Sequence, residues 1–329
     1  MTVSVCIPTF NQAPFIEDAI WSAYNQSIKP IEIIVSDDAS TDYTNSILER
    51  LRNEIPILKV ITQTVNHGIV FNVNACLKAA KGDLIVRLDS DDILHPKYVE
   101  SFLPYFRENI NIGFGHCATF EIDIQGIVTR LRTLYRKENV QNSTIALKES
   151  LEGYKVTANI LIFRRTTLEE VGFIQSKVNF AEDYYLACSI SDSGYSNVYL
   201  SNKLASYRVW NDNKKIRNKR KLSEIVGLNV VFSEVIEPAF LKRGWSLKNV
   251  TRAKERQAIR HSDCLSLDLY SLSEKKELKA ELLRLSNTFK AKMVYYSYLH
   301  GFGGVINLNK WFLSKIKNLV KSLISICSN

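Results

Sequence analysis

The stretch that decides the fold class is Leu84–Asp92 (LIVRLDSDD), in which a short apolar run passes directly into a cluster of carboxylates. An apolar run of about four to eight residues is typical of a strand that is buried on both faces. Asp89, Asp91 and Asp92 follow the end of this run. The pattern predicts a buried strand that delivers acidic side chains to one edge of a sheet.

Three further short apolar or β-branched runs precede this stretch, at Val3–Ile7, Ile31–Val35 and Leu58–Thr62. Segments with helical spacing separate them, among them Ile16–Tyr24 and Val70–Ala79. This alternation predicts an α/β fold, a Rossmann-like and mostly parallel sheet with covering helices. Ligands of such sheets bind beyond the carboxyl ends of the strands.

Polar residues stand at three of these strand ends, at Pro8–Asn11, Ser36–Ser40 and Asp89–Asp92. The three carboxylates of the last group repel one another, so a cation or several hydrogen-bond donors must offset their charge. Hard divalent cations take carboxylate and phosphate oxygens, which suggests a metal-bridged diphosphate ligand. An acidic turn that caps a helix starting near Pro96 explains the same residues equally well.

The pair Asp37-Asp38 has the same two interpretations, because the turn that follows leads into a helix predicted at Thr44–Leu51. A third acidic pair, Glu182-Asp183, opens a helix predicted over Ala181–Ile190. Helix capping explains any one of these acidic groups. It does not explain why two of them follow strands of the same sheet and a third opens a helix. The combination therefore favours a ligand site.

The rest of the chain divides into a mixed segment and a helical one. Extended segments are predicted at Phe114–Ile124, Asn159–Phe163 and Asn197–Val209. Only helical patterns follow residue 222, at Leu222–Val235, Arg252–Leu269 and Ser273–Leu285, with Ser273 as a candidate N-cap. We therefore expect an α/β domain over 1–213 and a C-terminal helical region over 214–329.

Six motifs occur in one order along the first part of the chain. They are Ser4–Asn11 (SVCIPTFN), Ile33–Asp42 (IIVSDDASTD), Asn66-x-Gly68, Gly82–Leu84 (GDL), Leu88–Asp92 (LDSDD) and Glu182-Asp183. In this order and spacing the chain resembles the family 2 glycosyltransferases of the GT-A fold, over about residues 1–210. The resemblance implies that 1–213 is the catalytic domain of an inverting transferase that uses a nucleotide sugar.

The resemblance also implies roles for single residues. The nucleotide-sugar site would be formed by Pro8, Thr9, Asn11, Asp37, Asp38, Asn66, Gly68, Asp89, Ser90 and Arg208. Thr9 would line the nucleotide pocket, and Asp38 would accept a hydrogen bond from the uracil N3–H while Asp37 supports the turn. Asp91, with Asp89, would hold Mn²⁺ or Mg²⁺ at the donor's diphosphate. Asp183 would be the general base, with Glu182 beside it in the acceptor site.

These residue types suit the implied chemistry. Direct displacement at the anomeric carbon, with inversion, needs one carboxylate within hydrogen-bond reach of the acceptor hydroxyl. A divalent cation stabilises the charge that develops on the leaving nucleoside diphosphate. Two separate acidic groups are therefore expected.

The sequence departs from the commonest family pattern after residue 200. Processive members often carry a Gln-x-x-Arg-Trp motif, whereas Ala205–Trp210 reads ASYRVW. This difference favours a transferase that adds a single sugar. Arg208 would reach the diphosphate. The basic run 214–221 is either a lid over that site or, as charge runs usually are, a solvated loop.

The charge distribution excludes one class of partner. The chain of 329 residues carries 43 Lys and Arg against 34 Asp and Glu, a net charge of +9. Seven of the basic residues lie in 282–329, which contains no Asp or Glu. The rest of the chain is near neutral and has no basic stripe with interleaved aromatic residues, so we expect no nucleic-acid binding.

The remaining composition points to the cytoplasm. Six scattered cysteines without C-x-x-C spacing predict a reducing compartment. We expect no signal peptide, because the chain opens on a strand-like run, and no transmembrane helix, because no apolar run reaches ~18 residues.

A basic amphipathic helix is predicted over 309–327, with the apolar residues of Phe312–Cys327 on one arc and the lysines on the other. The nearby aromatic residues are Tyr295, Tyr296, Tyr298, Phe302 and Trp311. This pattern is typical of a helix that lies in the plane of an anionic membrane, here the inner face of the plasma membrane. The same periodicity fits a helix packed on its own domain or on a second subunit of a homodimer.

The leading interpretation is an inverting transferase that moves a sugar from a UDP-sugar to a glycan or lipid-linked saccharide acceptor. Synthesis of a bacterial surface polysaccharide, an O-antigen or a capsule, would suit it. One alternative is a scaffold or membrane-binding subunit with the same fold, although its intact acidic clusters argue against this. Another is an aspartate-nucleophile phosphatase built on Leu88–Asp92, but that class places its nucleophile after its first strand.

Overall fold

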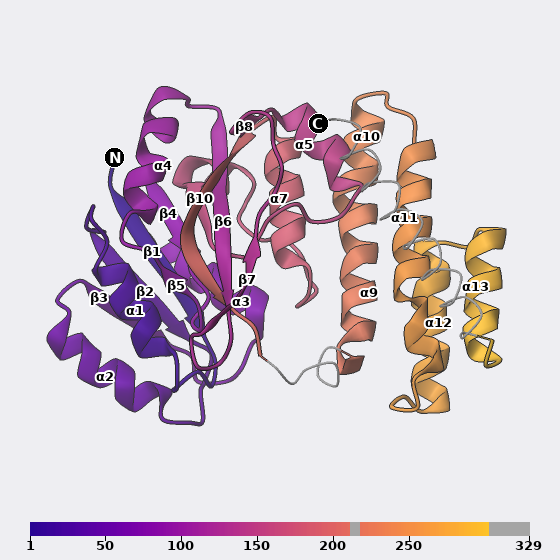
Figure 1. Cartoon of the computed structure of the whole chain (residues 1–329), viewed down its shortest axis with the longest axis horizontal. Helices are drawn as coiled ribbons and strands as arrows, with labels where there is room; N and C mark the ends of the chain where they lie inside the picture. The colour runs from indigo at the N-terminus through magenta and orange to yellow at the C-terminus, as the bar shows by residue number, and fades with distance from the viewer. Residues whose placement is uncertain (211–217, 303–329) are drawn as a thin grey trace, which may run out of the picture.

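The computed structural model describes residues 1–210 and 218–302, which form an α/β body followed by a layer of helices (Figure 1). The strands are β1 Val3–Thr9, β2 Glu32–Asp37, β3 Leu58–Thr62, β4 Leu84–Arg87, β5 Ile93–Leu94, β6 Ile112–Ile122, β7 Val128–Arg132, β8 Val140–Gln141, β9 Leu161–Arg164 and β10 Ser196–Arg208. The helices of the body are α1 Ile16–Tyr24, α2 Thr44–Glu54, α3 Ile69–Ala79, α4 Tyr98–Glu108, α5 Ser143–Ser150, α6 Arg165–Glu170 and α7 Glu182–Asp192.

One sheet runs through the body in the order β3-β2-β1-β4-β9-β6-β10-β5, with β7 paired to β6 and β8 paired to β10. The strands β3, β2, β1 and β4 are parallel, which confirms the predicted alternation of strands and helices. Antiparallel β9 joins β4 to β6, so the second half of the sheet is mixed. The acidic ends of β2 and β4 therefore lie on either side of β1.

Helices cover both faces of the parallel half. Side chains alternate along a strand, so Val5 and Ile7 pack with α1 on one face while Cys6 packs with Val73 of α3 on the other. Burial on both faces explains why β1, β2 and β4 are mostly apolar, whereas the edge strand β3 is partly exposed. The five cysteines in the described residues are all free and buried, as small core residues.

The C-terminal region stands beside the body as a layer of helices, which Figure 1 shows upright on the right. These elements are α9 Lys221–Val230, a π-helical turn Val231–Ile236, α10 Glu237–Lys242, α11 Lys248–His261, a 3-10 turn Ser262–Ser266, α12 Leu272–Leu285 and α13 Phe289–Leu299. The layer packs closely on the body, because a Cβ at Gly227 of α9 would lie 2.5 Å from the Phe180 carbonyl oxygen. Phe180 immediately precedes the turn into α7, so the layer supports the start of that helix.

The predicted N-cap of α12 is wrong by two residues. Ser271, not Ser273, adopts the extended conformation of a cap and accepts a hydrogen bond from the Glu274 amide at 3.3 Å. The Glu274 carboxylate accepts in return from the Ser271 amide at 2.8 Å, which completes a capping box. Ser273 lies within the first turn.

The aromatic cluster that the sequence suggested for membrane contact is only partly exposed. Tyr295 and Tyr298 are buried, because α13 packs on α11, and the Tyr295 hydroxyl donates to the Leu282 and Ser286 carbonyls. Tyr296 and Phe302 are exposed. The predicted helix 309–327 lies outside the described residues, and within 1–210 and 218–302 no helix combines the length and apolar character needed to cross a membrane.

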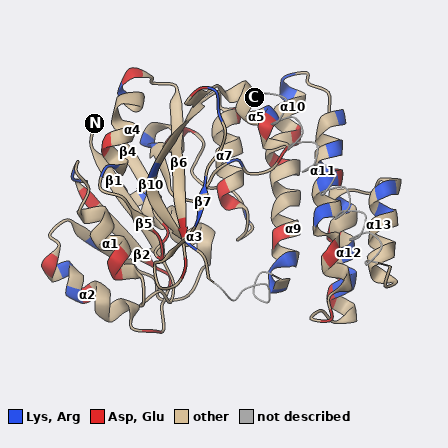
Figure 2. Cartoon of the chain, in the orientation of Figure 1, with Lys and Arg blue, Asp and Glu red and all other residues tan. Residues whose placement is uncertain are grey.

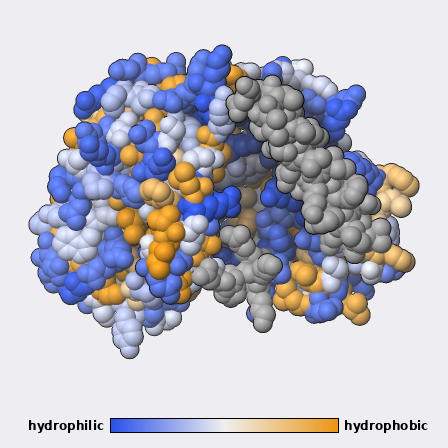
Figure 3. Space-filling model, viewed as in Figure 1, coloured by the Kyte–Doolittle hydropathy of each residue, from blue (hydrophilic) through white to orange (hydrophobic). Residues whose placement is uncertain are grey.

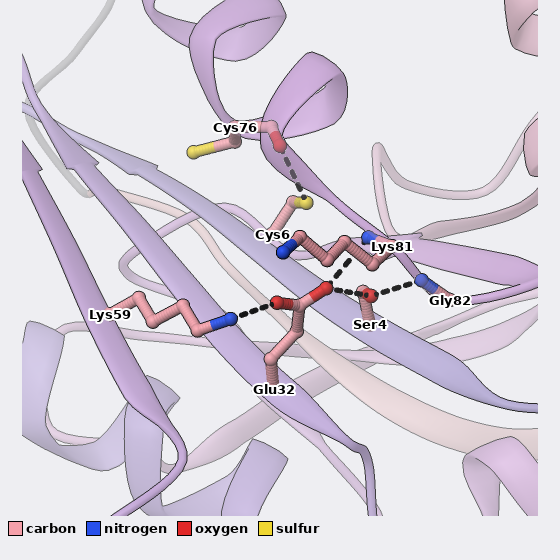
Figure 4. A network of polar contacts seen from close by, with 7 residues as sticks. All are labelled: Ser4, Cys6, Glu32, Lys59, Cys76, Lys81 and Gly82. Atoms are coloured by element: carbon pink, nitrogen blue, oxygen red, sulfur yellow. Dashed lines mark hydrogen bonds and ion pairs between the residues drawn. The ribbon is translucent and has the colours of Figure 1, made fainter.

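The buried carboxylate of Glu32 links several segments where β1 and β2 begin, at the end of the strands opposite to the acidic loops (Figure 4). Glu32 accepts hydrogen bonds from Ser4 Oγ at 2.7 Å, from the Lys81 amide at 2.7 Å and from Lys59 Nζ at 2.6 Å. Burial raises the pKa of Glu32, but these bonds outweigh it, and the pKa is lowered. The network joins three neighbouring strands to the turn before β4.

We expect Glu32→Gln to lower the free energy of unfolding by about 1–3 kcal/mol at neutral pH, because an amide matches only part of this set of donors. The folded pKa lies below the ordinary value of 4.5, so the carboxylate stabilises the fold above that pH and loses this effect as the pH falls through the folded pKa. Urea unfolding at neutral and acidic pH measures both effects.

The matched control is Glu17→Gln, which breaks an exposed ion pair with Arg50 and should change stability by less than about 1 kcal/mol. An equal loss of unfolding free energy in the two variants would contradict a stabilising role for the buried carboxylate. So would a Glu32→Gln variant whose stability depends on pH as that of the unmodified protein does.

Candidate active site

The structure brings the predicted polar strand ends together. The parallel register of β1 and β2 places Pro8 beside Ser36 and Thr9 beside Asp37. On the other side of β1, Cys6 is paired with Arg87 of β4, three residues before the end of β1, and the Asp89–Asp92 loop follows. Figure 2 shows acidic residues in the loops below the strands at this edge.

The turn after β2 is fixed by its own side chains. Asp37 accepts hydrogen bonds from the Ser40 amide, at 3.2 Å, and from the Ser40 hydroxyl. Asn11 has a positive φ of 53° and binds to this turn at two points. Its backbone amide donates to Ser40 Oγ at 2.8 Å, and its side-chain Oδ1 accepts from the Thr41 amide at 2.8 Å. These hydrogen bonds hold the turn after β2 in place, and the role of Asp37 in a nucleotide site stays a prediction.

Asp38 holds the loop before α3. Its two carboxylate oxygens accept from the amides of His67, at 2.9 Å, and Gly68, at 2.8 Å. Gly68 has a φ of 88°, which residues other than glycine rarely adopt, and a Cβ there would lie 2.3 Å from Asn179 Nδ2. Asn66 is exposed beside this loop. The role of Asp38 toward a uracil stays a prediction.

Several buried polar atoms near β1 have no hydrogen-bond partner in the described part of the chain, among them Thr9 Oγ1 and Asn72 Oδ1. The Asn72 side-chain amide donates to the Thr9 backbone carbonyl at 3.0 Å, so the Asn72 side chain lies against the end of β1. Buried polar groups without partners are rare in folded proteins and often mark a ligand site. Sequence reasoning missed Asn72, although a polar residue three positions after Ile69, on the buried side of α3, was a usable signal.

The loop after β4 exposes part of its acidic cluster. Asp92 is fully buried and accepts from the Arg208 amide at 2.8 Å, whereas Asp91 accepts from Trp210 Nε1 at 2.8 Å and Asp89 is partly exposed. Ser90 is buried between them. Burial raises the pKa of Asp89, Asp91 and Asp92.

The donor set fits a hard divalent cation. The carboxylates of Asp89 and Asp91 are oxygen ligands, and a cation would offset the mutual repulsion that this loop carries. No group of three or more His, Cys, Asp or Glu side chains within 1–210 and 218–302 is arranged to hold an ion. Substrate phosphates and water would therefore complete the coordination, as is usual for Mg²⁺.

Arg208 is buried against the same loop. Its Nε donates to the Asp91 carbonyl at 2.8 Å, its Nη1 donates to the Asp123 carbonyl at 2.9 Å, and its guanidinium lies 4.5 Å from the centroid of the Phe15 ring. These contacts fix the position of the loop. The predicted contact of Arg208 with a diphosphate stays a prediction. Of the basic run 214–221, residues 214–217 lie outside the described residues and Lys221 begins α9.

Arg87 joins the two acidic groups, and sequence reasoning missed it. Its side chain is 2% exposed, its Nε lies 3.2 Å from Asp89 Oδ1 and its Nη2 lies 3.2 Å from Glu182 Oε1. Its Nη1 is buried without a partner in the described residues. The available signal was a charged residue inside an otherwise apolar strand, since a buried charge must be paired.

Asp183 and Glu182 start α7 with different surroundings. Ala181, at a φ of 58°, turns the chain into the helix. Glu182 is buried against Arg87, whereas Asp183 is half-buried and accepts a hydrogen bond from the next amide, that of Tyr184, at 2.7 Å. Burial and the neighbouring Glu182 carboxylate raise the pKa of Asp183 to about 7. A carboxyl group with this pKa is suited to accept a proton near neutral pH.

Comparisons with known proteins agree with this geometry. The model of the family described as "Glycosyl transferase family 2" matches residues 4–172. The chain is 32% identical to the chondroitin synthase of Escherichia coli over 194 residues, which are 58% of this chain and 27% of that protein. It is 27% identical to the putative teichuronic acid biosynthesis glycosyltransferase TuaG of Bacillus subtilis, over 74% of this chain and 92% of that one.

Two groups of solved structures share the fold. The S. aureus TarS fragment 1–349 in complex with UDP superposes with a TM-score of 0.55 at 20% identity, covering 92% of each chain. The mannosyltransferase PcManGT from Pyrobaculum calidifontis, in complex with GDP-Man and Mn²⁺, gives 0.56 at 21% identity, over 93% of this chain and 86% of that one. The sheet and its covering helices therefore have the predicted GT-A architecture.

Proposed function

Since the chain belongs to glycosyl transferase family 2, we propose that it transfers a sugar with inversion from a UDP-sugar to a glycan or lipid-linked saccharide acceptor. The chain spans 27% of the E. coli chondroitin synthase and 61% of an uncharacterized Haemophilus influenzae glycosyltransferase, so the activity is argued from its own site. Family membership contradicts the phosphatase interpretation. It also leaves the scaffold interpretation without support.

One observation carries the proposal: two acidic groups with different surroundings converge on one sheet edge. Asp89 and Asp91 lie in the loop after β4, Asp183 lies at the start of α7, and Arg87 joins the two groups through Asp89 and Glu182. Inverting transfer needs a donor side that tolerates diphosphate charge and an acceptor side with a base. The Asp89–Asp91 loop fits the first need and Asp183 fits the second.

We assign the steps as follows. Thr9, Asn72 and the Gly68 loop bind the nucleoside, and Asp89 with Asp91 holds Mn²⁺ or Mg²⁺, which supplies electrostatic stabilisation of the leaving diphosphate when bound. Asp183 accepts the proton of the acceptor hydroxyl as that oxygen attacks the anomeric carbon. Glu182 pairs with Arg87 and shapes the acceptor site.

The choice of a UDP-sugar is supported by the TarS complexes with UDP and UDP-GlcNAc, although PcManGT binds GDP-Man. Relatives named for chondroitin and teichuronic acid synthesis support a role in a bacterial surface polysaccharide. We further propose a peripheral position at the inner face of the plasma membrane, since residues 282–329 include seven Lys and Arg and no Asp or Glu.

The test is calorimetry of UDP binding with Mn²⁺ or Mg²⁺ and with a chelator. We expect removal of the metal to weaken UDP binding by roughly 10-fold or more. Asp91→Asn should have the same effect in the presence of metal. The exposed Asp268→Asn serves as the matched control and should bind as the unmodified protein does. Equal affinity with and without metal would remove the role given to Asp91.

A further inference from the structure

The hairpin formed by β6 and β7 is unusually apolar for an exposed element. Its turn is built by Asp123, whose carboxylate accepts from the amides of Gln125 and Ile127, and by Gly126 at a φ of 82°. Val128 to Leu131 are exposed, so neither face of β7 is covered. The exposed fractions of its large apolar side chains are 41% for Ile124, 63% for Ile127, 55% for Val128, 44% for Leu131 and 98% for Tyr135.

Single exposed apolar residues are normal, but several of them exposed together on one hairpin indicate a contact surface. The five residues lie within twelve positions of the sequence and share one hairpin and the segment that follows it. Strand β7 pairs with β6 alone among the described strands, so its outer edge has no neighbour. Figure 3 shows hydrophobic residues gathered on the face of the α/β body that is turned to the viewer, next to hydrophilic ones.

The charged side chains from Ile124 to Lys137 are basic, whereas Asp123 and Glu138 border them and Glu121 of β6 pairs with Arg132 at 3.7 Å. Residues 124–137 contain Arg130, Arg132, Arg136 and Lys137 and no Asp or Glu. Arg130 and Lys137 are exposed, and β7 appears blue in Figure 2 for its arginines. Aliphatic side chains at a tip, a fully exposed tyrosine behind them and arginines alongside are the composition of a membrane-interface element. An acidic partner surface complements it, whereas a second copy would bring like charges together.

The hairpin is joined to the active-site loop. Arg208 Nη1 donates to the carbonyls of Asp123, at 2.9 Å, and Ile124, at 3.3 Å, while its Nε donates to the carbonyl of Asp91 at 2.8 Å. The Val209 amide donates to the Ile122 carbonyl at 2.8 Å. One buried side chain thus fixes the exposed apolar turn relative to the carboxylates of the donor site.

We propose that segment 123–137 is a membrane-docking hairpin whose partner is an anionic lipid surface. Ile124, Ile127 and Val128 enter the headgroup region, and Arg130 binds lipid phosphate. Because Arg208 holds the hairpin against the Asp91 loop, docking places the active site at the bilayer, where a lipid-linked acceptor presents its saccharide. The proposal deepens the membrane part of the proposed function and assigns that contact to the catalytic body.

The experiment reads the environment of the hairpin directly, in the full-length chain. Ile127→Cys is labelled with an environment-sensitive fluorophore in a Cys327→Ser background, since the cysteines of the described residues are buried. Ile110→Cys is the matched control, because Ile110 is 75% exposed and precedes the opposite end of β6, ~30 Å away along the strand. The proteins are mixed with vesicles of phosphatidylglycerol and phosphatidylcholine, or of phosphatidylcholine alone.

We expect the fluorophore at 127, and not the one at 110, to shift to the blue on anionic vesicles. Ile127→Ser combined with Tyr135→Ser should weaken sedimentation with these vesicles at least ~10-fold, while Ile110→Ser combined with Tyr43→Ser should not. Sedimentation without a shift at 127 would place the contact elsewhere, such as 309–327, and overturn this proposal alone.

No vesicle binding at all would overturn the membrane part of the proposed function as well. A change of oligomeric state in the Ile127→Ser/Tyr135→Ser variant, with unchanged vesicle binding, would assign the hairpin to a protein contact instead. The assay contains no nucleotide sugar, so none of these results depends on the donor assignment.

Discussion

Asp183→Asn will lower kcat by about 10²-fold or more while leaving the affinity for the donor unchanged. Asparagine has the shape of aspartate and still accepts the hydrogen bond from the Tyr184 amide, so α7 starts as before. It cannot accept the proton of the acceptor hydroxyl. Turnover of the UDP-sugar and calorimetry of UDP binding measure the two quantities separately.

The pH dependence of kcat is a second test of Asp183 as the base. Burial and the Glu182 charge raise the pKa of Asp183 to about 7, and a base is active in its ionised form. We therefore expect kcat of the unmodified protein to rise with pH through about 7 and then to level off. Asp183→Asn should lack this rise. Near-normal turnover, or a variant that keeps the same rise, would remove Asp183 as the base.

The first half of the fold was accessible from the sequence because each element carries its own pattern there. Leu58–Thr62 and Ile16–Tyr24 were predicted with the bounds that the structure has. Local signals decide such segments, since Leu58–Thr62 is a short run rich in apolar and β-branched residues and a covering helix must repeat its apolar residues every 3.6 residues. The position of Ser271 as the N-cap of α12 was missed, because Ser271 and Ser273 both stand before the same apolar pattern.

The candidate site was accessible only in part. Asp37, Asp89 and Asp183 follow strand or helix boundaries, so their placement could be inferred. The contact between Arg87 and Glu182 joins residues 95 positions apart and depends on how α7 packs against the sheet. The exposure of the β6–β7 hairpin is likewise a property of the folded chain, because Val128 and Leu131 have the pattern of any short strand.

Arg87→Met will reduce both stability and turnover, by separable mechanisms. It leaves Glu182 and Asp89 without their buried partner, and breaking a buried ion pair in this way costs about 3–5 kcal/mol. It also frees the Asp89 loop to move relative to α7, and a displacement of ~1 Å between reacting groups can lower the rate 10²-fold. Urea unfolding and turnover per folded molecule measure the two effects.

Two further variants separate positioning from folding. Arg87→Lys cannot reach two carboxylates with one forked group, so turnover should remain low even where stability partly recovers. Arg87→Met with Glu182→Gln removes the uncompensated charge, so stability should rise above that of Arg87→Met while turnover stays low.

The matched control for Arg87 is Arg164, another buried arginine. Arg164 donates to the carbonyls of Phe106, Asn109 and Ile112, away from the acidic groups. Arg164→Met should therefore lower stability and leave turnover per folded molecule unchanged. If Arg87→Met behaves in the same way, Arg87 only supports the fold. If it alone lowers turnover, the donor and acceptor sides of the site are held in register by this one guanidinium.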